Sequence, residues 1–279
     1  MKNETVIRDN GTTYRQFTKY LIDQYAHKKE RFTVNQYAQI VQVDSATGIF
    51  NRIKSMSPSQ NNESINITQA IEKYKVVTKN FNLRIGDRSE EKVDRKHYEK
   101  LACQAMNART NAVAKELLAP SNYDKSHIVD FMARYNDQSV SSPYDFFRTN
   151  VVGEAVNIIL RDTLGIVKKE NLNLVLRKKI ADRLSLPEKI CGIRVIRENS
   201  VDQTSWPESS AVICSCFDDM VTSNLSTLST CVIFAKEEMS CEKFDDPLNR
   251  LVELVVWETY CVQIVAPASG VLLTNLFLE

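Results

Sequence analysis

The cysteines are the residues of this chain best suited to metal chemistry. Seven are present, and Cys214 and Cys216 stand one residue apart, so they could hold a zinc ion together with Cys191, Cys231 or Cys241. The paired C-x-x-C spacing of structural zinc sites is absent, and most of these cysteines lie in apolar stretches. We therefore predict no bound metal. An odd number of cysteines without regular spacing indicates a reducing compartment, not a disulfide framework.

Histidine and acidic side chains are the other candidates for chemistry. His27, His97 and His127 lie in polar stretches, and none stands beside a recognisable nucleophile motif. The pairs Asp218-Asp219 and Asp245-Asp246 are neighbours in sequence, and strand neighbours point to opposite faces. They are typical of turns and caps, not of a general acid with its base. The glycine-rich phosphate-binding motifs are also absent.

We therefore predict no catalytic residue and no cofactor, and we expect that the chain is not an enzyme. A cytosolic α+β enzyme whose site is built from residues distant in sequence is the alternative that this pattern leaves open.

Composition places the chain among ordinary globular proteins. Of its 279 residues, 43% are hydrophobic and 25% are charged, with a net charge of +1 and a pI near 7.5. This balance gives no overall basic field of the kind that marks a nucleic-acid-binding protein. No apolar run is long enough to span a membrane, and the N-terminus lacks the hydrophobic region of a signal peptide. We expect a cytosolic protein that binds no membrane.

A long strand near the C-terminus is the most informative element that could position side chains. Residues Arg250–Val265 contain no glycine or proline and are rich in β-branched and aromatic residues. A strand of this length would tie two parts of the protein together. After a break at 266–270, Val271–Leu273 is predicted to be a further short strand. One face of the long strand, read at period two, comprises Val252, Leu254, Val256, Glu258, Tyr260, Val262 and Ile264.

The same stretch has a second interpretation, an amphipathic helix over Leu248–Tyr260. Asp246 would cap it and Pro247 would occupy its first position. The valine and aromatic content favours the strand, because these residues lose side-chain freedom in a helix.

A long polar hairpin is predicted over residues 48–89. Ile49–Met56 would form its first strand, residues 57–64 its turn, and the return would run in strand-like pieces from Ile65 to Ile85. Both faces carry charged or amide side chains. A two-stranded ribbon of this kind is marginal alone in water, so it needs a partner surface.

The clearest helix covers residues 90–119, with acidic residues at its start and Pro120 after its end. Its apolar stripe is rich in alanine, which allows close approach to a sheet. Residues 1–47, which precede the hairpin, are polar, and a short helix is expected at Tyr14–His27. This segment is predicted to be an arm that lies on a neighbouring subunit.

From residue 145 onward the pattern alternates, which predicts a mixed α+β domain. Helices are expected at Val151–Leu164, with Gly165 as its stop, and at Lys178–Leu186. Strands are expected at Leu172–Leu176, Gly192–Ile196, Ala211–Cys214 and Thr230–Phe234.

The end of the chain resembles the C-terminus of tailed-bacteriophage major capsid proteins of the Hong Kong-97 type. The shared order is an acidic residue, an aromatic residue, alternating valines, a proline, a small residue and Val-Leu-Leu. Here it runs from Glu258 and Tyr260 through Val262 and Pro267 to Leu273. The order of predicted elements resembles this family over nearly the whole chain. The segment from Cys214 departs from it, since many members carry a Gly-Asp-Phe-like turn there.

The resemblance implies an α+β Hong Kong-97-type capsid fold with five parts. They are an N-terminal arm (1–47), an extended hairpin loop or E-loop (48–89), a peripheral domain (90–144) with the long spine helix Glu91–Leu118, an axial domain (145–249), and a long terminal strand (250–279) that returns through the peripheral domain.

For function, the resemblance implies a major capsid protein that self-assembles into pentamers and hexamers of an icosahedral shell around double-stranded DNA. The DNA would be bound without sequence specificity, and the basic run His27-Lys28-Lys29 could face it. A separate scaffolding protein, a portal and decoration proteins are possible further partners. The protein would belong to the virion and would assemble in the cytoplasm of a host bacterium. Encapsulins, shells that hold protein cargo, share this fold and are the first alternative.

The hairpin would reach an adjacent subunit through wet contacts of modest energy. The predicted contact residues are Arg52, Lys54, Glu63, Glu72, Lys73, Lys75, Lys79 and Arg84.

Overall fold

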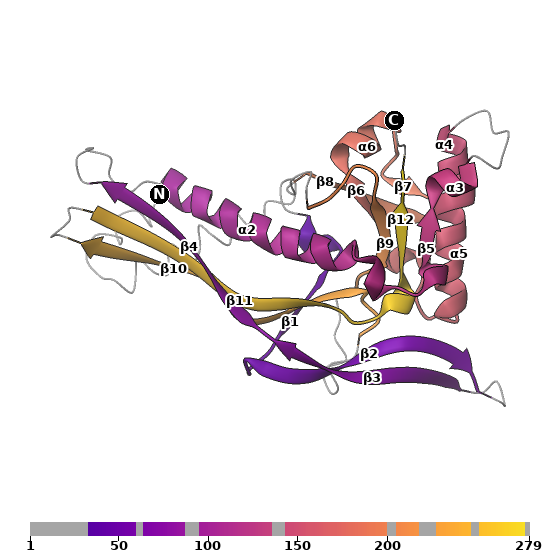
Figure 1. Cartoon of the computed structure of the whole chain (residues 1–279), viewed down its shortest axis with the longest axis horizontal. Helices are drawn as coiled ribbons and strands as arrows, with labels where there is room; N and C mark the ends of the chain where they lie inside the picture. The colour runs from indigo at the N-terminus through magenta and orange to yellow at the C-terminus, as the bar shows by residue number, and fades with distance from the viewer. Residues whose placement is uncertain are drawn as a thin grey trace, which may run out of the picture.

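The computed structural model describes residues 33–59, 64–86, 95–135, 143–199, 205–217, 227–246 and 251–276. Their strands form three sheets, and the fold is α+β as predicted (Figure 1). A four-stranded sheet has the order β1 (Gln39–Gln42), β10 (Cys231–Asp246), β11 (Leu251–Ile264) and β4 (Val77–Gly86). A six-stranded sheet has the order β5 (Ile128–Asp130), β12 (Gly270–Thr274), β9 (Ala211–Ser215), β6 (Leu172–Arg177), β8 (Ile193–Glu198) and β7 (Lys189–Ile190). The third is a ribbon of β2 (Thr47–Pro58) and β3 (Ile65–Lys75).

The predicted terminal strand is β11, and it is central to the four-stranded sheet. It pairs antiparallel with β10 on one side and with β4 on the other. Its predicted face is buried from Leu254 to Ile264 at every second residue. The chain then passes through the short helix η7 (Pro267–Ser269) into β12 of the six-stranded sheet, so this segment joins the two sheets. The helix interpretation is wrong for the described residues 251–260.

The long helix α2 (Arg95–Leu117) covers one face of the four-stranded sheet (Figure 1). Ala102 and Ala105 are fully buried against it, because side chains of one carbon let a helix lie close to a sheet. Leu101, Met106 and Val113 fill the rest of that core. Within the described residues, no helix is both long and apolar enough to cross a membrane.

A second core lies on the six-stranded sheet. Its helices are α3 (Phe131–Tyr135), α4 (Pro143–Phe146), the π-helix η5 (Phe147–Val152), α5 (Gly153–Asp162) and α6 (Lys178–Arg183). Their apolar side chains pack with Leu174, Ile213 and Val271. Gly165 ends the α5 region with φ +71°, as its position predicts. Short 3-10 turns lie between these elements in the described residues: η2 (Val34–Gln36), η3 (Pro120–Asn122), η4 (Lys125–His127) and η6 (Lys169–Asn171).

The return strand of the hairpin is shorter than predicted. It ends at Lys75, and the next strand, β4, pairs with β11 along its whole length. Phe81, Leu83 and Ile85 lie on the face of the sheet that α2 covers, and the polar residues between them lie on the other face. That alternation looks the same in a ribbon and in the edge of a larger sheet, so the sequence could not separate them.

The strand predicted at Thr230–Phe234 is present from Cys231 onward but is longer than predicted. It is the start of β10, which has 16 residues and belongs to the four-stranded sheet. Its second half, from Lys236 to Asp246, is mostly charged. This half has β11 on one side, and β1 pairs only with residues 232–235 on the other, so it tolerates polar residues and gives no apolar signal.

The end of the predicted arm belongs to the core. Val34, Tyr37 and Ala38 are buried, and β1 pairs in parallel with β10. The Tyr37 hydroxyl donates a hydrogen bond to the buried Glu198 carboxylate at 2.8 Å. Residues 34–43 of the predicted arm are therefore held within their own chain. The predicted helix at Tyr14–His27 lies outside the described residues.

Candidate functional site

The β2–β3 ribbon is the best candidate for a functional surface, because one end is anchored and much of it is exposed. Figure 1 shows it as a separate ribbon, while the four-stranded sheet extends on the other side of the molecule. Phe50 and Tyr74 pack against Phe234 of β10, with ring centroids 5.4 and 4.8 Å from it. The Ile53 amide donates to the Val265 carbonyl at 2.8 Å. These contacts fix the direction in which the ribbon leaves the body.

A glycine makes the anchor possible. A Cβ atom on Gly48 would lie 2.5 Å from the ring of Tyr74, so only a residue without a side chain lets the tyrosine stack there.

A row of exposed isoleucines lies along β3, on the same side of the ribbon as the buried Ile53 and Met56 of β2. Ile65, Ile67 and Ile71 are 41, 44 and 73% exposed, and they share one face of β3 because they occupy odd positions. Ile49, 57% exposed, lies opposite Lys73 on the same face. The contact residues predicted from the sequence were all charged, so these isoleucines were not among them. The signal was the period-two recurrence of isoleucine at 65, 67 and 71. We call these four residues the isoleucine face.

The predicted contact residues are divided by the structure. Lys54, Lys73 and Lys75 are exposed on the ribbon. Arg52 is held within its own chain, at 3.4 Å from Glu72 and with a hydrogen bond to the Asn122 carbonyl. Glu63 lies outside the described residues.

Lys79 and Arg84 belong to β4, not to the ribbon, and they leave it on opposite faces. Lys79 points towards α2, with its ammonium group 4.7 Å from the centre of the Tyr260 ring. Arg84 lies on the outer face and pairs with Glu253 at 3.2 Å. Neither residue therefore extends the isoleucine face.

The outer face of the four-stranded sheet is acidic and partly aromatic. The register places Glu242 opposite Val255, and Phe244 opposite Glu253, on the face away from α2. Phe244 is 48% exposed. Glu237, also exposed, shares this face, because it lies opposite Thr259. We call this surface the acidic sheet face; its described members are Glu237, Glu242, Phe244, Glu253, Val255 and Trp257.

The inner face of the same sheet holds a buried charge pair. Glu258 of β11 is fully buried and accepts a hydrogen bond from Arg109 of α2. Burial raises the pKa of the Glu258 carboxyl, and the positive charge of Arg109 opposes that shift. Burial also raises the pKa of the neighbouring Tyr260 hydroxyl. An acidic residue in an otherwise apolar alternation was the sequence signal for this pair.

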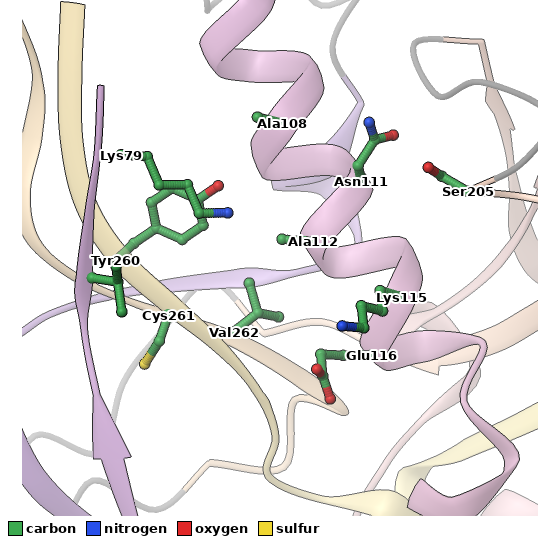
Figure 2. Close-up of a pocket in the computed structure, with 11 residues that line it drawn as sticks. Lys79, Ala108, Asn111, Ala112, Lys115, Glu116, Ser205, Tyr260, Cys261 and Val262 are labelled. Carbon is green, nitrogen blue, oxygen red and sulfur yellow. The ribbon is translucent and has the colours of Figure 1, made fainter. Parts of the chain in front are cut away.

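A pocket of about 670 Å³ lies beside this pair, between α2 and the strands β4 and β11 (Figure 2). Lys79 and Tyr260 approach it from the sheet, and Asn111 and Lys115 from the helix. Burial lowers the pKa of Lys79, and the positive charge of Lys115 adds to this effect. The lining of the pocket therefore contains two lysine side chains, Lys79 and Lys115.

The cysteines do not form a reactive group. Cys214 and Cys231 are buried, and burial raises the pKa of both thiols, which disfavours the reactive thiolate. Among the described side chains, no three of His, Cys, Asp and Glu gather as a metal site would require. Asp218 and Asp219 lie outside these residues.

His127 is not in polar, solvated surroundings as its sequence context indicated. It is buried between two oxygen atoms, the Gly270 carbonyl at 2.7 Å from Nδ1 and the Asp162 carboxylate at 2.9 Å from Nε2. Both ring nitrogens are used in these contacts, which tie α5 to the start of β12. Its position is that of a structural residue at the joint between the two sheets.

Comparison with known proteins gives a consistent fold. No family model matches this sequence, and no curated protein sequence matches it. Among solved structures, a phage-related protein from Bordetella bronchiseptica RB50 is 13% identical, with a TM-score of 0.67 over 94% of this chain and 97% of that one. A virus-like particle from Pyrococcus furiosus is also 13% identical, with a TM-score of 0.61 over 93% and 99%.

An encapsulin complex from Synechococcus elongatus PCC 7942 is 10% identical, with a TM-score of 0.53 over 88% of this chain and 87% of that chain. Capsids of phages are among the other similar structures. The chain therefore has the fold of Hong Kong-97-type phage capsid proteins and encapsulins, as the sequence resemblance implied. At these identities the likeness concerns the fold.

Proposed function

We propose that this chain is a major capsid protein, which assembles into pentamers and hexamers of an icosahedral shell enclosing double-stranded DNA. Its role is structural, not catalytic. It would be part of a virion and would assemble in a bacterial cytoplasm, where a scaffolding protein, a portal and decoration proteins are possible partners.

The isoleucine face is the observation that carries this proposal. Four large apolar side chains of the anchored ribbon are between 41 and 73% exposed. Burying what remains exposed on them is worth about 3 to 6 kcal/mol per ribbon. A contact of this size is weak for one pair of subunits, but a closed shell repeats it for every subunit. Weak single contacts allow misplaced subunits to leave, and the completed shell is still stable.

The acidic sheet face of a second copy is the surface that fits the ribbon. The ribbon presents isoleucines together with Lys54, Lys73 and Lys75. The acidic sheet face offers Phe244 and Trp257 for apolar contact and the exposed Glu237 for the lysines, while Glu253 is already paired with Arg84 of its own chain. Apolar residues at the centre with opposite charges around them are typical of specific interfaces.

An encapsulin-like shell holding protein cargo is the second candidate, supported by the similar fold of the encapsulin complex. The two candidates share the assembly and differ in what the shell contains. Nucleic acid content therefore separates them.

Negative-stain electron microscopy of the full-length chain tests the proposal. The recombinant protein is imaged over a range of concentration and salt, and its nucleic acid and protein content is measured after nuclease treatment. We expect closed, uniform shells or rings of five and six subunits. Nuclease-protected DNA supports a phage capsid, and one enriched foreign protein supports the encapsulin-like shell. A monomer or dimer under all conditions, including the presence of a scaffolding protein from the same genetic element, contradicts both.

A further inference from the structure

The solvent side of α2 carries a stripe of polar residues at helical spacing. Successive members are three or four residues apart, so they lie in one row along the helix, and Asn111 and Lys115 of this row also line the pocket beside the sheet. At 1.5 Å per residue the row is about 28 Å long. We call it the α2 stripe; its members are Lys96, Lys100, Gln104, Asn107, Asn111 and Lys115, of which all but the half-buried Asn111 are exposed.

The α2 stripe contains three lysines, three amides and no carboxylate. An ordinary solvated helix face alternates lysine with glutamate at spacings of three or four, because such pairs stabilise the helix. Lys100 and Lys115 have no acidic residue at those spacings on α2. Lys96 and Lys100 are four apart and repel each other. Lys100 therefore has no carboxylate beside it on α2, and an external polyanion would supply the negative charge.

The pocket beside α2 extends this positive surface. Lys79 reaches its floor from β4, and Lys115 stands on its helical wall (Figure 2). The lowered pKa of Lys79 reflects burial; the charge of Glu258 opposes this shift, and the weaker repulsion by Lys115 adds to it. Glu116, the acidic side chain in the lining, is turned to Asn122, whose amide donates to it at 3.2 Å.

We propose that the α2 stripe binds the phosphate backbone of double-stranded DNA. Lysine and amide side chains are the usual donors to phosphate oxygens, and such contacts carry no sequence information. A row of about 28 Å would follow roughly eight base pairs of one strand. The charge of the chain as a whole is only +1, so the basic row is a local feature.

This inference rests on the proposed function and adds to it the orientation of the subunit in the shell wall. A surface that contacts packaged DNA faces the interior, so α2 would form the lining of the shell. The opposite face of the sheet, which carries Glu253 and Phe244, would then be turned away from the DNA. Carboxylates there would repel phosphate, which agrees with the division of charge between the two faces.

The test compares two double variants of the full-length chain that lose the same charge. Lys100→Gln with Lys115→Gln changes the α2 stripe. Lys178→Gln with Lys189→Gln removes two exposed lysines from α6 and β7 of the six-stranded sheet. Binding of a fluorescent 30-base-pair duplex to unassembled subunits, whose α2 stripe is accessible, is measured by anisotropy from 50 to 300 mM salt. Shells formed by the same proteins are imaged in parallel. Each lost phosphate contact lowers the slope of log affinity against log salt by about 0.9.

For the stripe variant we expect intact shells, a slope lowered by about 1.8 and, relative to 1 M salt, affinity reduced roughly 60-fold at 100 mM salt. The matched variant should bind like the wild type. An equal loss of duplex affinity in both variants, or no loss in either, overturns the inference. It is also overturned if polyaspartate displaces the labelled duplex as effectively as unlabelled duplex does. Failed assembly of the stripe variant alone also overturns it, because the stripe would then be a subunit contact. Wild-type subunits that bind no duplex before assembly refute this inference and leave shell formation standing; absence of shells refutes the proposed function.

Discussion

Glu258 of β11 and Arg109 of α2 form a charge pair inside an otherwise apolar layer. The Glu258 side chain is fully buried and that of Arg109 is 12% exposed. Glu258 Oε1 and Arg109 Nε have no hydrogen-bond partner among the described residues. A buried pair with unmet hydrogen bonds adds little stability, but it allows one position of the helix along the sheet. We interpret it as the residue pair that sets the register of α2 on β11.

Arg109→Met should destabilise the fold by about 3 to 5 kcal/mol, because it leaves Glu258 buried without its partner. The double variant Arg109→Met with Glu258→Leu should regain most of that loss, since two apolar residues replace the pair. Arg84→Met is the matched control on the exposed Arg84–Glu253 pair and should cost less than about 1 kcal/mol. Urea unfolding followed by fluorescence measures all three. Equal losses at Arg109 and Arg84 would contradict the assignment.

The loss in Arg109→Met should depend on pH. Burial raises the pKa of Glu258 in the folded state above its unfolded value, so the folded chain binds the extra proton. The contribution of such a group is present at low pH and is lost as pH rises through the folded pKa. The destabilisation by Arg109→Met should therefore be smaller near pH 5 than at pH 8. A loss that is constant with pH would mean that Glu258 is not the group left unpaired.

Ile71→Asp should prevent assembly without unfolding the subunit. Ile71 is 73% exposed, so the change should alter the free energy of unfolding by less than about 0.5 kcal/mol. A charge at the centre of an apolar contact costs far more in the assembled state. Thr68→Asp is the control, because Thr68 is exposed on the opposite face of the same strand. Sedimentation velocity should show shells for Thr68→Asp and none for Ile71→Asp. Shells of normal yield from Ile71→Asp would show that the isoleucine face is not an assembly contact.

Val256→Pro should abolish folding of the chain. Val256 pairs with Cys241 on one side and with Phe81 on the other, so a proline removes a ladder donor from a central strand. Val256→Ala keeps the backbone donor and should still give folded protein of lower stability. Circular dichroism and soluble yield distinguish the two. A well-folded proline variant would show that the described pairing of β11 is wrong.

Asp162→Asn should lower the melting temperature by a few degrees at neutral pH and by less in acid. Hydrogen bonds from Arg161, and then from His127, hold the pKa of Asp162 below its usual range. Stability from a depressed carboxyl pKa is present above the unfolded value of about 3.9 and is lost as pH falls through the folded value. The difference between wild type and variant should therefore shrink below about pH 4. A difference that grows in acid would contradict this sign.

Element order could be predicted because it depends on local patterns. The alternation of valine and aromatic residues in 251–264 predicted β11, and the helical spacing from Tyr98 to Val113 predicted α2. Gly165 predicted the end of the α5 region. Each signal is contained within one element, so no knowledge of partners was needed.

The membership of each sheet could not be predicted in this way. Residues 77–86 alternate as a ribbon strand would, yet they pair with residues 251–260, far away in sequence. The charged second half of β10 gave no apolar signal, because one of its sides is an edge. Choosing a partner strand is a competition between distant segments, and only the folded chain resolves it.

The sequence by itself determined that this is an α+β chain with a long terminal strand, a long alanine-rich helix and a polar hairpin, since burial periodicity and turn chemistry are local. The tertiary structure decided which faces of these strands and helices are exposed to solvent. It placed Lys79 beside Tyr260 instead of on the ribbon, enclosed Glu258 and His127, and left Ile71 and the α2 stripe exposed. Exposure depends on what the rest of the chain covers, and that is a property of packing among residues distant in sequence.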